Sequence, residues 1–163
     1  MTTKTGYSHL QILLHWAIAL LILFNYLYSE GMGRALDARL EGAPAPALDI
    51  APAVHVWVGV AVLVLVLLRA LLRLTTGAPD AGGTGLMQRA AGWGHRLLYA
   101  LMLAVPAFGG IAWFGGVDAV ADLHALLANV LMVVAGGHAL IALYHQYVLK
   151  DRLLLRMMRP GRS

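Results

Sequence analysis

The segment "DLHALLANVLMVVAGGHALIALYH", residues Asp122 to His145, decides the fold of this chain. It is an almost unbroken apolar run, and about 20 such residues in an α-helix cross the ~30 Å hydrocarbon core of a bilayer. Nevertheless it carries three imidazoles, at His124, His138 and His145. Ionisable side chains inside membrane spans are rare and mostly functional. The segment therefore predicts a transmembrane helix that also carries chemistry.

The composition of the whole chain agrees with a membrane protein. Of its 163 residues, 60% are hydrophobic and only 12% are charged, whereas soluble domains have about 25% charged residues. Four stretches are long and apolar enough to span, at about residues 10–28, 51–74, 93–113 and 122–149. We predict an all-α integral membrane four-helix bundle, as a single transmembrane domain over residues 1–163. Residues 150–163 are interpreted as a basic segment on the membrane surface.

The basic residues predict the orientation of the bundle. Ten of the twelve lie at the N-terminus, in or beside the second loop, or in the C-terminal tail, so they share one side of the membrane. Lys and Arg collect on the cytoplasmic side, which predicts that both termini are cytoplasmic. The outer side has only Arg34 and Arg39, among several acidic residues. This asymmetry accounts for the net charge of +4 without a nucleic-acid partner.

Histidine is the main source of chemistry, because cysteine is absent. Without cysteine there are no iron–sulfur clusters, no disulfides and no covalently attached c-type haem. His124 and His138 are 14 residues apart, which places them ~21 Å apart along a helix and within ~40° of the same face. That separation fits two flat cofactors stacked across one bilayer. His145 would lie ~31 Å from His124, which leaves too little cover for both.

Each of these two histidines has a partner at matching depth. His15 lies near the cytoplasmic start of the first span, level with His138. His55 lies near the outer start of the second span, level with His124. Two neutral imidazoles facing each other across a bundle are suitable axial ligands for the iron of a b-type haem. The predicted pairs are therefore His15/His138 inside and His55/His124 outside.

Two further histidines, His95 and His145, are predicted near the cytoplasmic surface, with Trp16 close by. A quinone head needs hydrogen-bond donors at its carbonyls and a proton source once it is reduced, and histidine supplies both. These three residues are the candidate quinone site. The alternative is that they only anchor helix ends. No residue is assigned as catalytic.

The chain resembles the bacterial cytochrome b561 family, within the wider group of cytochrome b subunits of nickel–iron hydrogenases and formate dehydrogenase. The resemblance covers most of the chain and rests on five matching stretches: "SHLQILLHW" (8–16), "AVHVWVGVAVLVLVLLRALLRL" (53–74), "GHRLLYALMLAVP" (94–106), "LHALLANVLMVVAGGHALIALYH" (123–145) and "KDRLLLRMMRP" (150–160).

This resemblance implies a multi-pass protein of the bacterial inner membrane that holds two b haems non-covalently. By position, the ligands it implies are the four histidines that the depth argument selects. It also implies a ubiquinone site, mapped to His95 and His145. For stand-alone members it implies superoxide oxidase activity, in which superoxide at the outer face gives one electron to haem and ubiquinone is reduced. The short, acidic loop "FGGVDAVAD" (114–122) departs from the long, partly basic third loop of some members.

Two alternative functions remain open from the sequence. In the first, the di-haem core is the membrane subunit of a dehydrogenase or hydrogenase, with that enzyme as its protein redox partner. The absence of long outer loops for docking argues against it. In the second, the histidines line a metal-ion or proton transporter that holds no haem, although the internal repeats typical of transporters are not evident.

Overall fold

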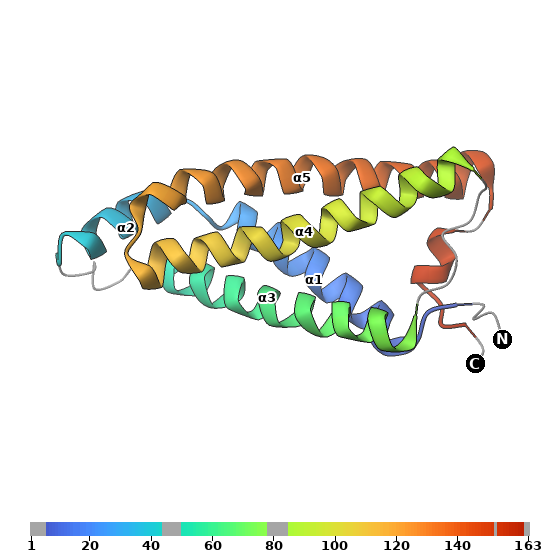
Figure 1. Ribbon diagram of the computed structural model, residues 1–163, viewed down its shortest axis with the longest axis horizontal. Coiled ribbons are helices and arrows are strands. Elements are labelled where there is room, and N and C mark those ends of the chain that lie inside the picture. Colours follow the sequence, from blue (N-terminus) through green and yellow to red (C-terminus); the bar gives the residue numbers. More distant parts are fainter. Residues whose placement is uncertain (1–5, 44–49, 78–84, 152, 162–163) are drawn as a thin grey trace.

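Four long helices run alongside one another in the computed structural model, which describes residues 6–43, 50–77, 85–151 and 153–161 (Figure 1). They are α1 (His9–Leu27), α3 (Ala51–Thr76), α4 (Leu86–Gly115) and α5 (Ala121–Tyr144). Each belongs to a segment long and apolar enough to cross a membrane. The prediction of an all-α four-helix membrane bundle is confirmed.

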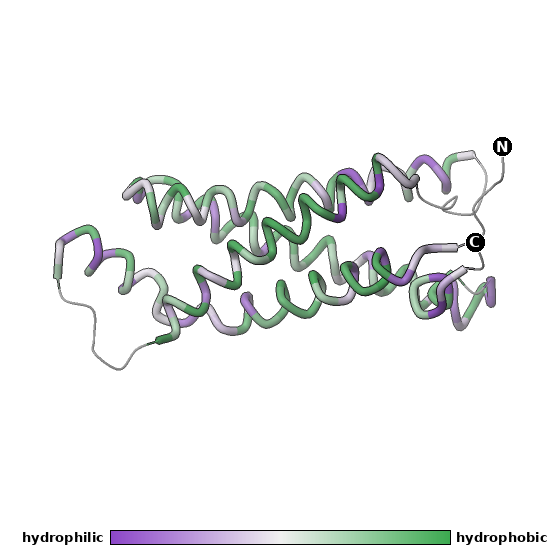
Figure 2. Tube along the Cα trace, turned by 90° about the horizontal axis from the view of Figure 1, so that it is seen from below, coloured by the Kyte–Doolittle hydropathy of each residue, from purple (hydrophilic) through white to green (hydrophobic). Residues whose placement is uncertain are grey.

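The described termini meet at one end of the bundle. The Gly161 N–H donates to the Tyr7 carbonyl at 3.2 Å, and the backbones of Gly6 and Gly161 approach so closely that neither position has room for a Cβ. We call this end the terminal end and the opposite one the α2 end. Hydrophilic residues gather mostly toward the two ends, whereas the middle of the bundle is apolar (Figure 2).

Among the basic residues used to predict orientation, Lys4, Arg152 and Arg162 lie outside the described residues.

The helices pack in chain order. A cluster of Leu14, Ile18, Val62 and Val66 joins α1 to α3, and a second cluster, with Leu98, Leu101 and Leu131, joins α4 to α5. α3 packs along α4, whereas the backbones of α1 and α5 come close at few points. Side chains bridge that side: Ile22 of α1 packs on the α4–α5 cluster, and the Tyr26 hydroxyl donates to Asn129 Oδ1 at 2.7 Å.

The helix bounds differ from the prediction mainly between the spans. α4 begins at Leu86 rather than near residue 93, because its start is amphipathic and hydropathy alone does not detect it. The helix α2 (Met32–Leu40) was not predicted. It begins after Gly31, whose φ of +82° suits glycine, and it buries Leu36 against the end of the bundle. α2 thus covers one end of the helices.

The chain after α5 folds back toward α1 (Figure 1). α5 continues into a short π-helix, η2 (His145–Leu149), and Lys150 then turns the chain with a φ of +57°. A 3-10 turn, η3 (Leu154–Met157), follows. The Trp16 indole N–H donates to the Met157 carbonyl at 2.8 Å. The described part of the basic tail therefore lies against the start of α1, and its position on a membrane surface stays a prediction.

Gln11 ties the start of α1 to the end of α3. Its side-chain oxygen accepts from the Ser8 N–H at 3.0 Å, completing a capping box. Its amide nitrogen donates to the Thr76 hydroxyl and to the Gly77 carbonyl, both at 3.1 Å. Gln11 is 8% exposed, so these bonds are shielded from water. One buried side chain therefore satisfies the ends of two helices.

Replacing Gln11 with leucine tests this joint. The substitution leaves the Ser8 N–H and the groups at the end of α3 without their partner, which costs about 1–3 kcal/mol. We expect a lower midpoint of thermal unfolding in detergent, followed by circular dichroism. The matched control is Gln88→Leu, at an exposed position near the start of α4. Equal midpoints for the two variants would contradict the role of Gln11.

Candidate cofactor sites

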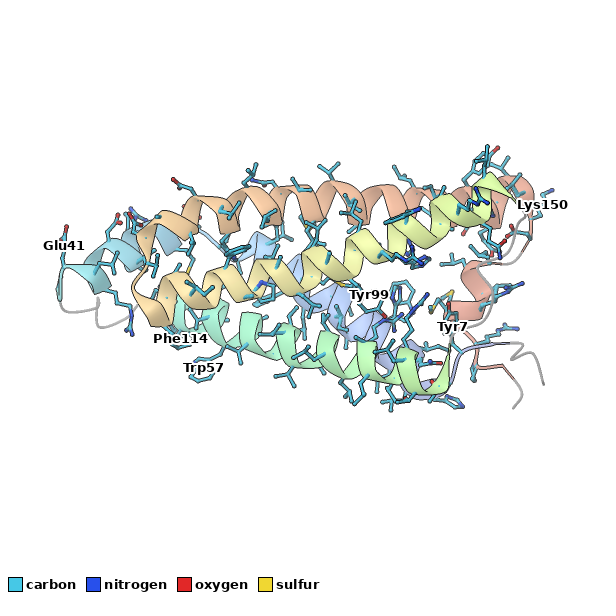
Figure 3. All side chains as sticks on the ribbon, in the orientation of Figure 1. Tyr7, Glu41, Trp57, Tyr99, Phe114 and Lys150 are labelled. Atoms are coloured by element: carbon cyan, nitrogen blue, oxygen red, sulfur yellow. The ribbon has the colours of Figure 1, made fainter. Side chains whose placement is uncertain are left out.

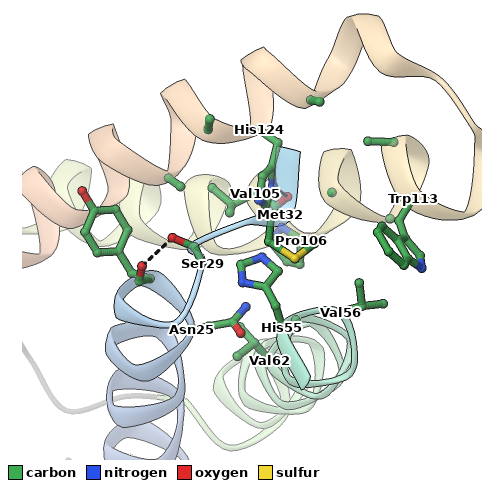
Figure 4. A pocket seen from close by; sticks show the side chains of 18 of the residues that line it. Asn25, Ser29, Met32, His55, Val56, Val62, Val105, Pro106, Trp113 and His124 are labelled. Carbon is green, nitrogen blue, oxygen red and sulfur yellow. Dashed lines mark hydrogen bonds between the residues drawn. The ribbon is translucent and has the colours of Figure 1, made fainter. Parts of the chain in front are cut away.

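At the α2 end, His55 on α3 and His124 on α5 face each other with ring centroids 6.2 Å apart. They line a cavity of about 570 Å³ (Figure 4), within the ~300–1,000 Å³ typical of ligand and cofactor sites. Most of the wall is apolar, and Met32 and Leu36 of α2 form part of it. The structure thus brings together the outer pair predicted from the sequence.

The ring separation matches two imidazoles on opposite sides of one metal atom. A histidine nitrogen ligates a metal at roughly 2 Å, and the ring centre lies about 1 Å behind it, so the two centres are about 6 Å apart. In the described parts of the chain, no three His, Asp or Glu side chains gather around a bare metal ion. A haem iron brings its own four nitrogen ligands and needs two imidazoles. The pair and its cavity therefore fit a haem.

The orientation of His124 is fixed by α4. Its Nδ1–H donates to the Val105 carbonyl at 2.8 Å, which leaves Nε2 as the nitrogen that can ligate, as in most metal-binding histidines. The ring occupies the space beside Gly109, where an added Cβ would lie 2.9 Å from the Nδ1 and Cε1 atoms. Only glycine allows the ring to approach α4 so closely.

His55 is held less tightly: the backbone of Asn25 and Tyr28 lies close to its ring, but without the geometry of a full hydrogen bond. Its Nδ1 atom and the Oδ1 atom of Asn25 are both buried without a hydrogen bond. Figure 4 shows the Asn25 amide beside the His55 ring. A donor nitrogen and an acceptor oxygen are therefore available at the wall of this cavity. Buried polar atoms are rarely left unpaired, which agrees with a site that a ligand completes.

At the terminal end, three histidine rings gather instead of two. His15 on α1 lies 6.4 Å from His138 on α5, centroid to centroid, across the side where the backbones of these helices come close at few points. His95 on α4 lies 5.3 Å from His138, which is too close for a metal atom between those two rings. The His95 Nδ1–H donates to the Ala91 carbonyl at 2.7 Å. The geometry favours His15 as the partner of His138, as predicted.

The quinone candidates lie in different surroundings. His95 is next to His138, whereas His145 starts the π-helix and its Nδ1 lies 2.5 Å from an Asp151 carboxylate oxygen. This hydrogen bond holds the pKa of Asp151 below its usual range. The His95 ring contacts His138, whereas the His145 ring contacts Tyr144 and Asp151. Trp16 contacts the His15 ring at 5.4 Å, but its N–H is taken by Met157.

The structure adds residues that sequence reasoning did not select as site residues. Gly109 and Asn25 are visible only once the helices pack, because neither carries a sequence signal of its own. Arg69 and Arg73 were used for orientation alone, yet both lie within the α3 span. The sequence alone could have pointed to both arginines, because charged residues inside an apolar span are rarely without a role.

The chain is similar to known proteins over nearly its whole length. Residues 6–160 match the model of the prokaryotic cytochrome b561 family. The chain is 53% identical to cytochrome b562 from Cereibacter sphaeroides over 161 residues, covering 98% of this chain and 99% of the relative. It is also 33% identical to a probable superoxide oxidase, CybB, from Yersinia pestis, covering 96% and 98% of the two chains.

Alanine at Gly109 tests the packing of His124. The added methyl group displaces the ring, so we expect the haem of this end to be lost or its optical spectrum to change. The control is Gly92→Ala on the same helix, outside the cavity lining, where no described atom lies within 4 Å of an added Cβ. Haem content by pyridine haemochrome and the reduced spectrum are measured for both. If both variants keep the parental spectrum, Gly109 does not position His124.

Proposed function

This chain belongs to the prokaryotic cytochrome b561 family, and from that premise we propose that it carries two b haems and transfers electrons from superoxide to ubiquinone. Membership of this family indicates a membrane cytochrome b that takes part in electron transport. The proposal of two haems is carried by one observation, a facing histidine pair near each end of the bundle. The similarity to a probable superoxide oxidase supports the choice of donor.

The proposed axial ligands are His55 and His124 at the α2 end and His15 and His138 at the terminal end. When bound, haem supplies a one-electron carrier that the protein side chains lack. The two proposed ligands on α5, His124 and His138, are 14 residues apart, or ~21 Å along the helix. The two carriers would therefore lie at different depths of the membrane. The chain's part is to hold both imidazoles of each pair at one height and to exclude water.

The α2 end is the proposed donor side. Arg39 on α2 donates to the Trp113 carbonyl at 3.1 Å and lies 5.1 Å above the Trp113 ring. Trp113 lines the cavity, so a permanent cation lies against one of the wall residues, although it is not itself part of the wall. A cation there attracts a small anion such as superoxide. Asp122 also lines the cavity, and its negative charge repels an anion. The attraction of superoxide to this end therefore depends on the charge of Arg39.

The terminal end is the proposed ubiquinone side. Asp151 is ionised, so the His145 Nδ1 must donate to it. The other ring nitrogen, Nε2, is then the atom that accepts or releases a proton. Gln146 places a buried Oε1 atom without a hydrogen-bond partner in the described chain, which can accept from a quinol hydroxyl. Trp16 and His95 complete the proposed site. Because the Trp16 N–H donates to the Met157 carbonyl, Trp16 would contribute its ring rather than a hydrogen bond.

The overall reaction balances over two turnovers of the donor. Two superoxide anions are oxidised to two O₂ molecules, and one ubiquinone takes the two electrons and two protons. We propose that the terminal end faces the cytoplasm, because basic residues gather there and such residues collect on the cytoplasmic side of membranes. The protons are then taken from the cytoplasm. A bacterial inner membrane is the location that matches this arrangement.

Removing one ligand tests the pairing. We expect His124→Ala or His55→Ala to lose one haem of two and to keep the other, because each haem has its own pair. Haem per chain is measured by pyridine haemochrome and the remaining haem by its low-spin spectrum. The matched control is His9→Ala, an exposed histidine at the start of α1. Loss of both haems, or of neither, would contradict the assignment.

Pulse-generated superoxide tests the function. The purified protein, loaded with ubiquinone, is mixed with superoxide, and haem reduction and quinol formation are followed optically. We expect fast haem reduction followed by quinol in the parent chain. His145→Ala should keep both haems and slow quinol formation, because the proton donor is lost. A colourless preparation, or haem that superoxide leaves oxidised, would overturn the proposal.

A further inference from the structure

Two arginines lie one helical turn apart on α3 beside the terminal-end histidines. Arg69 and Arg73 are both half-buried and both within the span. Arg69 contacts the Gln11 carbonyl, one turn before His15 on α1, and Arg73 lies near Tyr99, one turn after His95 on α4. Two permanent cations therefore lie about one helical turn from the histidines of the terminal end.

Neither guanidinium has an acidic partner in the described chain. The ion pair found there joins His145 to Asp151. One nitrogen of Arg69 donates to the Gln11 carbonyl at 2.5 Å, and Arg73 lies 5.9 Å from the Tyr99 ring. A guanidinium has five N–H donors, so most of them remain unused. Unpaired charges inside a membrane are costly, which indicates an anionic partner that the chain itself does not supply.

The pocket that the arginines border is too small for an anionic partner. It is lined by Tyr7, Gln11 and Tyr99 as well, and its volume of about 10 Å³ is close to that of one water molecule. Tyr7 and Tyr99 both lie toward the terminal end (Figure 3). A free phosphate does not fit this pocket. We therefore place the anionic partner beside the His15 and His138 rings, which face each other 6.4 Å apart.

We propose that Arg69 and Arg73 form a carboxylate-binding site for the propionate groups of the haem held by His15 and His138, and that they raise its midpoint potential. This inference rests on the proposed two-haem function. Haem carries two propionates, and guanidinium groups bind carboxylates in a fork geometry. A positive charge beside the haem stabilises its reduced form, which has one more negative charge.

The charge difference between the two sites sets a direction for electrons. The lining of the α2-end cavity contains Asp122 and no lysine or arginine among its described residues. The terminal-end site faces two arginines. The haem at the terminal end is therefore the better electron acceptor of the two. Electrons entering at the α2 end are drawn toward the proposed quinone side.

Redox titration of single-haem protein tests this assignment. In a His124→Ala background only the His15/His138 haem is present, so its midpoint is read directly. We expect Arg69→Gln and Arg73→Gln each to weaken reduction at least tenfold, a fall of about 59 mV or more for one electron. Arg69→Lys and Arg73→Lys keep the charge and should stay closer to the parent. The control is Arg89→Gln, an exposed arginine in the first turns of α4.

The outcomes separate this proposal from others. Unchanged midpoints in both glutamine variants, or an equal fall in the Arg89 control, would overturn it. If a glutamine variant loses the remaining haem, the lysine variants test the proposal instead. Lysine variants that keep this haem with a midpoint near that of the parent support the proposal. Lysine variants that lose the haem as well overturn it.

Two further arms exclude other sources of the effect. Titration in nanodiscs of zwitterionic lipid, with and without phosphatidylglycerol, should give the same midpoint. A shift that disappears in Arg69→Gln would identify a lipid phosphate as the anion and overturn the proposal. The haem count of the parent chain is measured first. Fewer than two haems there means that the proposed function has failed, before any arginine variant is made.

Discussion

The structure depends on the separation between α1 and α5. These helices carry His15 and His138, which face each other 6.4 Å apart, but they barely pack together. In a bilayer, apolar side chains gain little by association, so close packing and polar contacts hold helices together. Toward the α2 end the Tyr26–Asn129 hydrogen bond joins these two helices, and at the height of His15 and His138 the proposed haem would be the joining group. A haem clamped between imidazoles would make metal bonds where side-chain packing is missing, and its binding would stabilise the folded chain.

The two ends of the bundle are chemically different, although each has a histidine pair. At the α2 end, α2 covers an apolar cavity and holds Arg39 against Trp113, a residue of the cavity wall. At the terminal end, the arginines of α3 lie inside the span and the tail folds back onto Trp16. This asymmetry is what the proposed transfer of electrons from the α2 end to the terminal end requires.

Small residues and backbone groups determine how the imidazoles point. His124 depends on the Val105 carbonyl and on the missing side chain of Gly109, while His95 depends on the carbonyl one turn earlier in its own helix. Such partners select which ring nitrogen is free to ligate and keep the ring from rotating. The neighbours of the histidines therefore matter almost as much as the histidines themselves.

The amino-acid sequence by itself determined the helical membrane fold and the heights of the histidines, because hydropathy and a rise of ~1.5 Å per residue are local properties of a chain. It therefore predicted that His15 meets His138 and that His55 meets His124. Only the tertiary structure decided that α1 and α5 stay apart, that α2 covers one end, and that His95 joins His138 rather than His145. Those facts depend on the rotation of each helix and on which helices are neighbours. Neither follows from periodicity, since the helices are apolar on nearly all faces and many rotations would bury them equally well.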